Sequence, residues 1–306
     1  MKLTCGIAIP THNRRMDLQR TCAVIAALEP QPDEVVICVD GCRDDTEIFL
    51  RNAHPTFRLI INERGLGASA ARDTMFGSME SDIVLSLDDD SYPIETDFVR
   101  RLCEIFSTNP RLGVAAFPQR SDEFPKTLNA TDFGPSHFIG SYANCSVAIR
   151  KSVFLEVGGY FKEFWNAYDE PDFALRCVAA GYEVRLETSL SVRHHYTGVQ
   201  RNELRTHRLH ARNELWSVFM RCPAPQLFAV ALFRAMRQFA YACKRGWRWA
   251  LTEPVWWFAC LSGVPRCLES RKPIPWGRYR DWMKLVHRPI VEQARWLERF
   301  GMENLP

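Results

Sequence analysis

The feature that most constrains the fold is the alternation of apolar, strand-like runs with helix-like segments along roughly the first 110 residues. Short apolar runs, rich in β-branched residues, occur at 3–9, 34–39, 57–61 and 82–87. Helical spacing is found between and after them, at 14–29, 43–53, 69–79 and 95–108. This alternation predicts an α/β protein with a doubly wound sheet and helices on both of its faces.

Beyond residue 110 the alternation weakens, although strands and helices are still predicted. We expect strands at 112–117 and 145–149 and one or two more within 182–193. Helices are predicted at 151–157 and 172–180, each followed by glycine.

The distribution of charge divides the chain near residue 200. Residues 1–200 carry 20 Lys and Arg against 28 Asp and Glu, a net charge of −8, whereas residues 201–306 carry 19 against 8, a net charge of +11. Eight of the nine tryptophans also lie after residue 200. We therefore predict an α/β domain over 1–200 and a basic, Trp-rich helical extension over 201–306.

Several classes of protein are excluded by composition. No stretch reaches the roughly 18 uncharged apolar residues that a membrane-spanning helix needs. The apolar run at the N-terminus is broken by Pro10 and is too short for a secretory signal. The 11 cysteines include no CxxC pair, which favours reduced thiols in a cytoplasmic protein.

Three consecutive aspartates, Asp88-Asp89-Asp90, directly follow the apolar run at 82–87. Adjacent carboxylates repel one another unless a cation lies among them, and Mg²⁺ or Mn²⁺ is a suitable cation that also binds substrate phosphates. Ligands of a doubly wound sheet bind beyond the carboxyl ends of its strands, which favours a functional role. A solvated acidic turn or a helix N-cap is the alternative.

Two further candidates follow other predicted elements. Asp40 ends the run at 34–39, where a carboxylate can accept hydrogen bonds from a base or a ribose; an ordinary turn before Gly41 is the alternative. Arg72 lies at the start of a helix behind a Gly-rich turn, a position that suits phosphate. Its alternative is a surface ion pair with Asp73.

A second acidic cluster, Asp169-Glu170-Pro171-Asp172, lies about 80 residues beyond the first. A carboxylate there can take a proton from an attacking hydroxyl, whereas the same residues also suit a helix start with Pro171 in its first turn. His194, after a predicted strand, is a candidate ligand for metal or phosphate, and a surface histidine pair with His195 is the alternative.

The order of these segments resembles the family 2 glycosyltransferases, inverting enzymes of the GT-A fold that use nucleotide-sugar donors. Seven segments carry the resemblance over about residues 3–200: PTHNR at 10–14, VDGCRDDT at 39–46, GLGASAARD at 65–73, SLDDDS at 86–91, VGGYFKEF at 157–164, YDEPDFALR at 168–176 and SVRHH at 191–195. The implied fold is a GT-A type, doubly wound mixed sheet with a C-terminal helical extension.

The resemblance also implies roles for individual residues. Those implied to bind the nucleotide sugar are Pro10, Thr11, Arg14, Asp40, Arg72, Asp88 and Asp89. Asp40 matches the residue that contacts the base, usually uracil. Asp88 and Asp90 match the ends of the DxD motif, and His194 joins them as an implied metal ligand. Mg²⁺ or Mn²⁺ is the implied cofactor.

Glu170 occupies the position of the family's catalytic Asp, and Asp169 remains a rival for that role. The family pattern EDVDL reads DEPDF here, so the two acids are exchanged in type. Lys162 stands where the family's GGFDE loop has an acid.

Residues 226–265 mix aromatic and aliphatic residues with Lys and Arg. This mixture is typical of a helix in a membrane interface, and we expect contact with an anionic leaflet. A helical subdomain with a solvated basic face is the alternative. No nucleic-acid-binding motif is recognised, and we expect no nucleic-acid partner.

The sequence as a whole predicts a metal-dependent, inverting glycosyltransferase on the cytosolic face of a membrane. The expected donor is a UDP-sugar, with dTDP- and GDP-sugars as alternatives, and the expected acceptor is a glycan or a lipid-linked hydroxyl in polysaccharide, glycolipid or glycan assembly. A non-catalytic nucleotide-sugar-binding or scaffold protein of the same fold is the alternative function. A nucleotidyltransferase is disfavoured because PTHNR contains no glycine.

Overall fold

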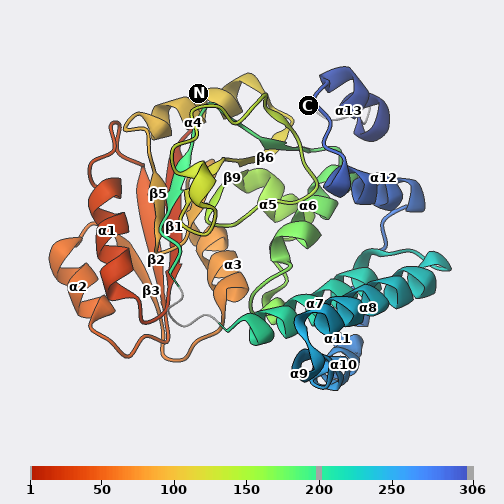
Figure 1. Ribbon diagram of the computed structural model, residues 1–306. Helices are drawn as coiled ribbons and strands as arrows, with labels where there is room; N and C mark the ends of the chain where they lie inside the picture. Colours follow the sequence, from red (N-terminus) through yellow and green to blue (C-terminus); the bar gives the residue numbers. More distant parts are fainter. Residues whose placement is uncertain (1, 198–201, 302–306) are drawn as a thin grey trace.

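The computed structural model describes residues 2–197 and 202–301 and is built around an eight-stranded mixed sheet (Figure 1). The strand order is β3-β2-β1-β4-β9-β6-β10-β8. Their bounds are β1 Cys5–Thr11, β2 Glu34–Asp40, β3 Arg58–Asn62, β4 Ile83–Leu87, β6 Leu112–Ala116, β8 His137–Phe138, β9 Ser146–Arg150 and β10 Glu183–Leu186. β9 runs antiparallel to both of its neighbours, and β8 runs antiparallel to β10.

The first four strands are parallel, as the alternation predicted. Ile7 of β1 pairs with Val35 of β2 on one side and with Leu85 of β4 on the other. Every residue of β4 is buried, which explains why four of its five residues are apolar. Parallel pairing brings the carboxyl ends of β1, β2 and β4 to one edge of the sheet.

Helices cover both faces of this sheet, which confirms the doubly wound architecture. One face packs against α1 (Arg15–Ile25), α2 (Thr46–Ala53) and α4 (Phe98–Thr108). The other packs against α3 (Ala68–Ser78), α5 (Lys151–Val157) and α6 (Asp169–Ala179). α1 ends four residues before its predicted end because the chain turns after Ile25 toward Pro30.

A separate three-stranded sheet was not predicted as a unit. It consists of β5 (Ser91–Pro93), β7 (Gln119–Ser121) and β11 (Val192–His194), in the order β5-β11-β7. β11 pairs antiparallel with β5 so that His194 lies opposite Ser91. This small sheet therefore carries the predicted histidine to the end of the three aspartates.

The C-terminal region is helical (Figure 1). Its helices are α7 (Glu203–Arg221), α8 (Gln226–Arg245), α9 (Trp247–Ala250), α10 (Glu253–Ser262), α11 (Val264–Glu269), α12 (Trp276–His287) and α13 (Gln293–Phe300). α8 and α10 pack on α7, whereas α13 reaches the main sheet, where Trp296 stacks on Phe138. The predicted domain boundary at residue 200 lies outside the described residues. No helix among the described residues has both the length and the apolar character needed to cross a bilayer.

Asp172 joins α6 to α7. Its carboxylate, which is fully buried, accepts hydrogen bonds from Arg176 Nε at 2.9 Å, Ser217 Oγ at 2.8 Å and Arg221 Nε at 3.1 Å. Burial alone raises the pKa of an aspartate, but Arg221 and Arg176 outweigh it and lower the pKa of Asp172 to about 2. The Asp172–Arg176 pair of α6 thus contributes to the packing of α6 on α7.

We expect Asp172→Asn to lower the free energy of unfolding by about 3 to 5 kcal/mol, because it leaves two buried arginines without a counter-charge. The folded pKa of Asp172 is depressed, so its contribution is present above pH ~4 and is lost as the pH falls toward ~2. Urea denaturation of the wild type and of Asp172→Asn at pH 7 and pH 3 measures the difference in the free energy of unfolding. Asp97→Asn, in an exposed pair with Arg100, is the control and should cost under ~1 kcal/mol.

Candidate functional site

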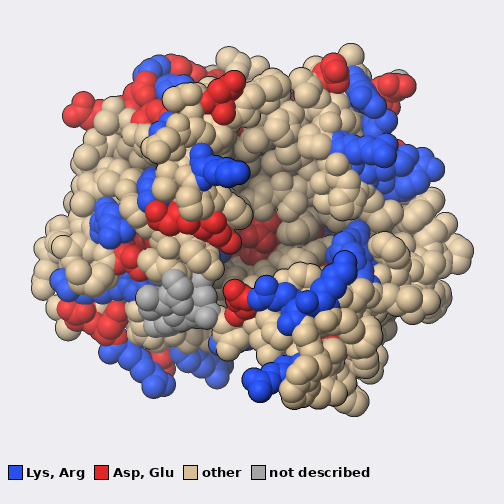
Figure 2. Space-filling view, viewed as in Figure 1, with Lys and Arg blue, Asp and Glu red and all other residues tan. Residues whose placement is uncertain are grey.

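The predicted site residues gather at the carboxyl edge of β1, β2 and β4 and at the start of α6. Figure 2 shows a hollow in the middle of the molecule, bordered by the sheet and by the C-terminal helices, with acidic atoms on its floor. Pro10 and Thr11 end β1, Asp40 ends β2, and Asp88 directly follows β4. The geometry separates these residues into groups with different surroundings.

The three aspartates do not share one environment. Asp88 is the most accessible of the three, with a third of its side chain exposed, whereas Asp89 and Asp90 are buried. Asp89 accepts a hydrogen bond from Thr11 Oγ1 at 3.0 Å. The middle residue of the motif therefore fixes the end of β1 to the end of β4.

Arg14, at the start of α1, forms ion pairs with both buried aspartates. Its guanidinium lies 2.8 Å from Asp89 Oδ1 and 2.7 Å from Asp90 Oδ2, and it also donates to Thr197 Oγ1. Burial, together with the charges of Asp90 and Asp88, raises the pKa of Asp89 to about 7 despite Arg14. Burial also acts to raise the pKa of Asp90, but contacts with His194 and Arg14 lower it to about 2. Arg14 was predicted to line the nucleotide pocket, and that role stays a prediction.

Asp40 holds the turn that leads into α3. Its carboxylate accepts hydrogen bonds from the backbone N–H groups of Leu66 and Gly67 and from Asn62 Nδ2. Gly67 has a φ of +90°, and a Cβ there would lie 2.3 Å from the carbonyl oxygen of Trp165. Contact of Asp40 with a nucleotide base stays a prediction, and the structure gives the residue a second role in shaping the turn.

Arg72 lies on the second turn of α3 and is buried. Its guanidinium forms an ion pair with Asp88 and donates to Ser86 Oγ at 3.1 Å. The negative charges of Asp88, Asp169 and Glu170 outweigh the effect of burial and raise the pKa of Arg72. Arg72 therefore links the aspartates at the end of β4 with the acidic residues of α6.

Asp88, Cys145 and His194 could hold a metal ion, because one ligand atom from each lies within 4.8 Å of the others. His194 Nδ1 lies 3.1 Å from Gln119 Oε1, and Nε2 lies 3.3 Å from Asp90 Oδ1. These two contacts orient the imidazole beside the aspartates, where it can serve as a metal ligand. The carboxylates and the imidazole fit Mn²⁺ or Mg²⁺. Burial, followed by the charge of Asp88, raises the pKa of Cys145, so its thiol stays protonated and fits a hard cation poorly.

Sequence reasoning missed Cys145 and Gln119. Cys145 resembles the apolar residues of the strand it precedes, and Gln119 lies in a strand of three residues. Both residues reach the site because strands far apart in the chain pair with each other, and no local sequence pattern indicates such pairing.

Asp169 and Glu170 lie in the first turn of α6. Asp169 is buried and accepts a hydrogen bond from Asn144 Nδ2 at 3.0 Å. Tyr160 donates to Asn144 Oδ1 at 2.8 Å, so a hydrogen-bonded chain fixes the Asp169 carboxylate. Burial and the neighbouring charge of Asp169 raise the pKa of Glu170 well above its usual range. A carboxylate with a raised pKa is suited to accept a proton.

The loop that precedes α6 has a strained backbone. Trp165, Ala167 and Tyr168 have φ values of 65°, 68° and 69°, which side-chain-bearing residues rarely adopt. Asn213 of α7 is fully buried, and its Nδ2 lies 2.8 to 2.9 Å from the carbonyl oxygens of residues 164, 166 and 167. One side chain of the C-terminal region thus holds the loop that positions Asp169 and Glu170.

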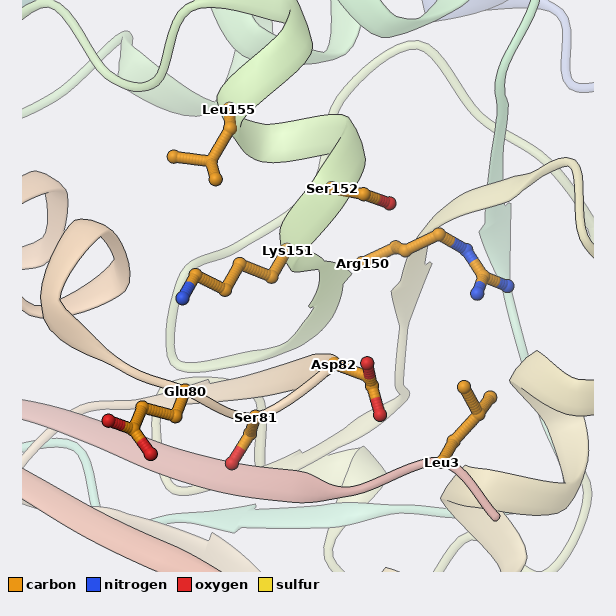
Figure 3. Close-up of a pocket in the computed structure, with 8 residues that line it drawn as sticks. All are labelled: Leu3, Glu80, Ser81, Asp82, Arg150, Lys151, Ser152 and Leu155. Atoms are coloured by element: carbon orange, nitrogen blue, oxygen red, sulfur yellow. The ribbon is translucent and has the colours of Figure 1, made fainter. Parts of the chain in front are cut away.

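A cavity of about 260 Å³ lies at the opposite end of the sheet. Figure 3 shows the side chains around it: Leu3, Glu80, Ser81, Asp82, Arg150, Lys151, Ser152 and Leu155. Asp82 precedes β4 and Arg150 ends the antiparallel β9, so this cavity lies at the amino end of β4. Since ligands of this fold bind at the carboxyl ends of the strands, the cavity is separate from the candidate site.

The sequence was compared with protein families and with curated proteins. The pattern of glycosyl transferase family 2 matches residues 6–173, more than half of the chain. A comparison with curated protein sequences finds no match.

Three solved structures share the fold. S. aureus TarS 1–349 has a TM-score of 0.59 at 13% identity, over 93% of this chain and 83% of that one. The mannosyltransferase PcManGT from Pyrobaculum calidifontis, solved with GDP-Man and Mn²⁺, has a TM-score of 0.57 at 17% identity, over 94% and 85%. GalNAc-T7 with UDP, GalNAc and Mn²⁺ has a TM-score of 0.57 at 14% identity, over 72% of this chain and 48% of GalNAc-T7. The chain therefore spans about half the length of GalNAc-T7, and these likenesses confirm the GT-A fold.

Proposed function

The chain belongs to glycosyl transferase family 2, and from that membership we propose that it is an inverting enzyme that moves a sugar from a nucleotide-diphosphate sugar to an acceptor hydroxyl. The observation that carries the proposal is the meeting of two groups of residues. The first group is the cluster of Asp88, His194 and Cys145. The second group includes Asp169, whose carboxylate accepts a hydrogen bond from Asn144, the residue before Cys145. Arg72 pairs with Asp88, and despite its burial its pKa is raised by the charges of Asp88, Asp169 and Glu170, so the metal-compatible cluster and the two carboxylates of α6 lie close together.

The proposed division of roles follows from this placement. The donor diphosphate binds near Asp88 and Arg72, where Mn²⁺ or Mg²⁺, when bound, neutralises negative charge. Glu170 accepts the proton of the acceptor hydroxyl as the new C–O bond forms. The bond between the anomeric carbon and the diphosphate oxygen breaks on the opposite face, so the configuration inverts. We favour Mn²⁺ because His194 adds an imidazole to the ligand set.

The donor proposal favours a UDP-sugar, with GDP- and dTDP-sugars as alternatives. It is supported by the resemblance of the Asp40 segment and by the UDP and GDP-Man with which GalNAc-T7 and PcManGT were solved. The proposed acceptor is a glycan or lipid-linked hydroxyl in polysaccharide, glycolipid or glycan assembly. Exposed apolar side chains on α8 and α10 support the lipid-linked form.

The function can be tested by following donor breakdown with NMR. The protein is incubated with Mn²⁺ and UDP-glucose, UDP-GalNAc or GDP-mannose, with water as a substitute acceptor. Phosphorus spectra report release of the nucleoside diphosphate, and proton spectra report the anomeric configuration of the freed sugar. We expect release of one nucleotide and an inverted sugar. Donor binding without any release would favour the non-catalytic alternative.

We expect Asn213→Ala to lower kcat by about tenfold or more, because the loop before α6 loses the side chain that holds its strained backbone. Donor affinity should change little, since Asn213 contacts neither α3 nor the end of β4. Steady-state kinetics and donor titrations measure the two effects. Asn202→Ala removes the N-cap of the same helix and is the control, because it should cost about 1 kcal/mol of stability without lowering kcat. An equal loss of kcat in Asn213→Ala and Asn202→Ala would contradict a positioning role for Asn213.

A further inference from the structure

The exposed and buried sides of α8 are reversed relative to an ordinary surface helix. At about 100° per residue, one arc of roughly 140° faces outward. The residues on this arc are all apolar: Phe228, Ala229, Leu232, Phe233, Met236, Phe239, Ala240 and Cys243. Phe228, Leu232, Phe233 and Met236 are between 63% and 75% exposed. A helix bordering water normally presents its polar face there.

Three polar residues in the middle of α8 contact α7 instead. Arg234 lies 3.0 Å from Glu214 Oε1, Arg237 binds the same oxygen, and Gln238 donates to Glu214 Oε2 at 2.6 Å. Glu214, on α7, is almost fully buried. Rotating α8 to bury its phenylalanines would break this buried network. The contacts with α7 therefore fix the apolar arc in its outward orientation.

α9 and α10 extend the same apolar surface. Phe239 of α8 and Trp257 of α10 lie with ring centroids 6.1 Å apart. Further large exposed side chains of α9, α10 and the turn between them are Trp247, Leu251, Val255, Phe258 and Leu261. We call the outward arc of α8 together with these residues the apolar face. In Figure 2 the surface over α8 is largely tan, with Lys and Arg along its border. Contiguous exposed apolar surface of this kind marks a binding site.

The charges around the apolar face are predominantly positive. Residues 223–272 contain eight Lys and Arg but only two acidic residues, and one of these, Glu253, is buried against His207. The exposed cations include Lys244 at the end of α8 and Arg248, whose guanidinium lies over the Trp247 ring. Aromatic and basic side chains bordering apolar surface match the headgroup region of an anionic bilayer.

We propose that the apolar face docks on a lipid bilayer that contains anionic headgroups, with α8 lying in the plane of the interface. The alternative occupant is a second copy of this chain. Pairing through the same face would bring two positive borders together, which opposes a dimer and favours an anionic surface. The proposal rests on this surface alone, so it can fail independently of the proposed catalytic function.

Vesicle co-sedimentation of the full chain tests the proposal. We expect binding to phosphatidylcholine vesicles with about 30% phosphatidylglycerol, and at least about tenfold weaker binding to phosphatidylcholine alone. Phe233→Glu combined with Phe258→Glu should reduce partition into the anionic vesicles by about tenfold or more. Both side chains are exposed, so the fold should tolerate the changes, and thermal unfolding checks this.

The matched control combines Ile48→Glu with Leu155→Glu, two exposed apolar residues on α2 and α5, and should bind vesicles like the wild type. Absence of wild-type binding would overturn the proposal. Equal binding by the wild type and the Phe233→Glu, Phe258→Glu protein would also overturn it. Light scattering in lipid-free buffer should give a monomer; a dimer that this variant dissociates would assign the face to a second copy.

Discussion

Replacing Glu170 with Gln is expected to lower turnover by a factor of ~10² to 10⁴ and to leave donor affinity within about twofold. Glutamine keeps the size of the side chain but cannot accept the proton of the acceptor hydroxyl. Burial and the charge of Asp169 raise the pKa of Glu170, so the wild-type rate should rise with pH until this carboxyl loses its proton. The variant should lack that rise. Kinetics across pH and calorimetric donor affinities provide the measurement.

Asp169→Asn is the matched comparison, because Asp169 is the adjacent acid. Its carboxylate is already held by Asn144, so we expect its loss to affect the placement of α6 more than proton transfer. If Asp169→Asn abolished turnover with intact donor binding and Glu170→Gln did not, Asp169 would be the base. If neither substitution changed turnover, the proposed acid–base role of this turn would be wrong.

The second large effect is expected for Asp88→Asn, which should weaken Mn²⁺-dependent nucleotide binding by a factor of ~10² or more. Asp88 is the most exposed carboxylate of the three and lies in the cluster with His194. Asparagine keeps one oxygen but removes the charge that attracts the cation. Calorimetric titration of the nucleotide with and without Mn²⁺ isolates the metal-dependent part.

Asp122→Asn is the control for this experiment. Asp122 is a partly exposed acid that pairs with Arg193 of β11, near the same small sheet, and has no place in the metal cluster. It should leave Mn²⁺-dependent binding unchanged. Unchanged binding in Asp88→Asn as well would remove Asp88 from the proposed metal site. Asp90, also predicted as a ligand, stays a candidate that Arg14 and His194 hold in place.

Most of the main sheet could be predicted because β1, β2, β4, β6 and β9 have five to seven residues, are almost entirely buried, and are apolar for most of their length. The strand predicted at 34–39, for example, is β2 at Glu34–Asp40. The strands β5, β7 and β8 have only two or three residues, too few to show periodicity. Their pairing depends on contacts between segments far apart in the chain, such as His194 opposite Ser91. Local sequence does not contain that information.

The candidate site was predictable only in part for the same reason. The resemblance indicated the residues of the DxD motif and the acids of α6. It did not indicate that the three aspartates differ in exposure and in their ion-pair partners. Arg14 pairs with the buried Asp89 and Asp90, whereas Asp88 pairs with Arg72 and is the most exposed of the three. Asn213, which holds the loop before α6 from 45 or more residues away, has no local signature. Such positions become visible only when the helices of the C-terminal region are placed on the sheet.

The most direct test of the donor site is a calorimetric titration of UDP, GDP, CDP and dTDP into the wild-type protein, with and without Mn²⁺. We expect that one of these nucleotides binds and that Mn²⁺ strengthens its binding by about tenfold or more. The identity of that nucleotide would also limit the possible donors to the sugars that are attached to it. The absence of binding by all four, in the presence of Mn²⁺, would contradict a nucleotide-sugar site at the carboxyl edge of this sheet.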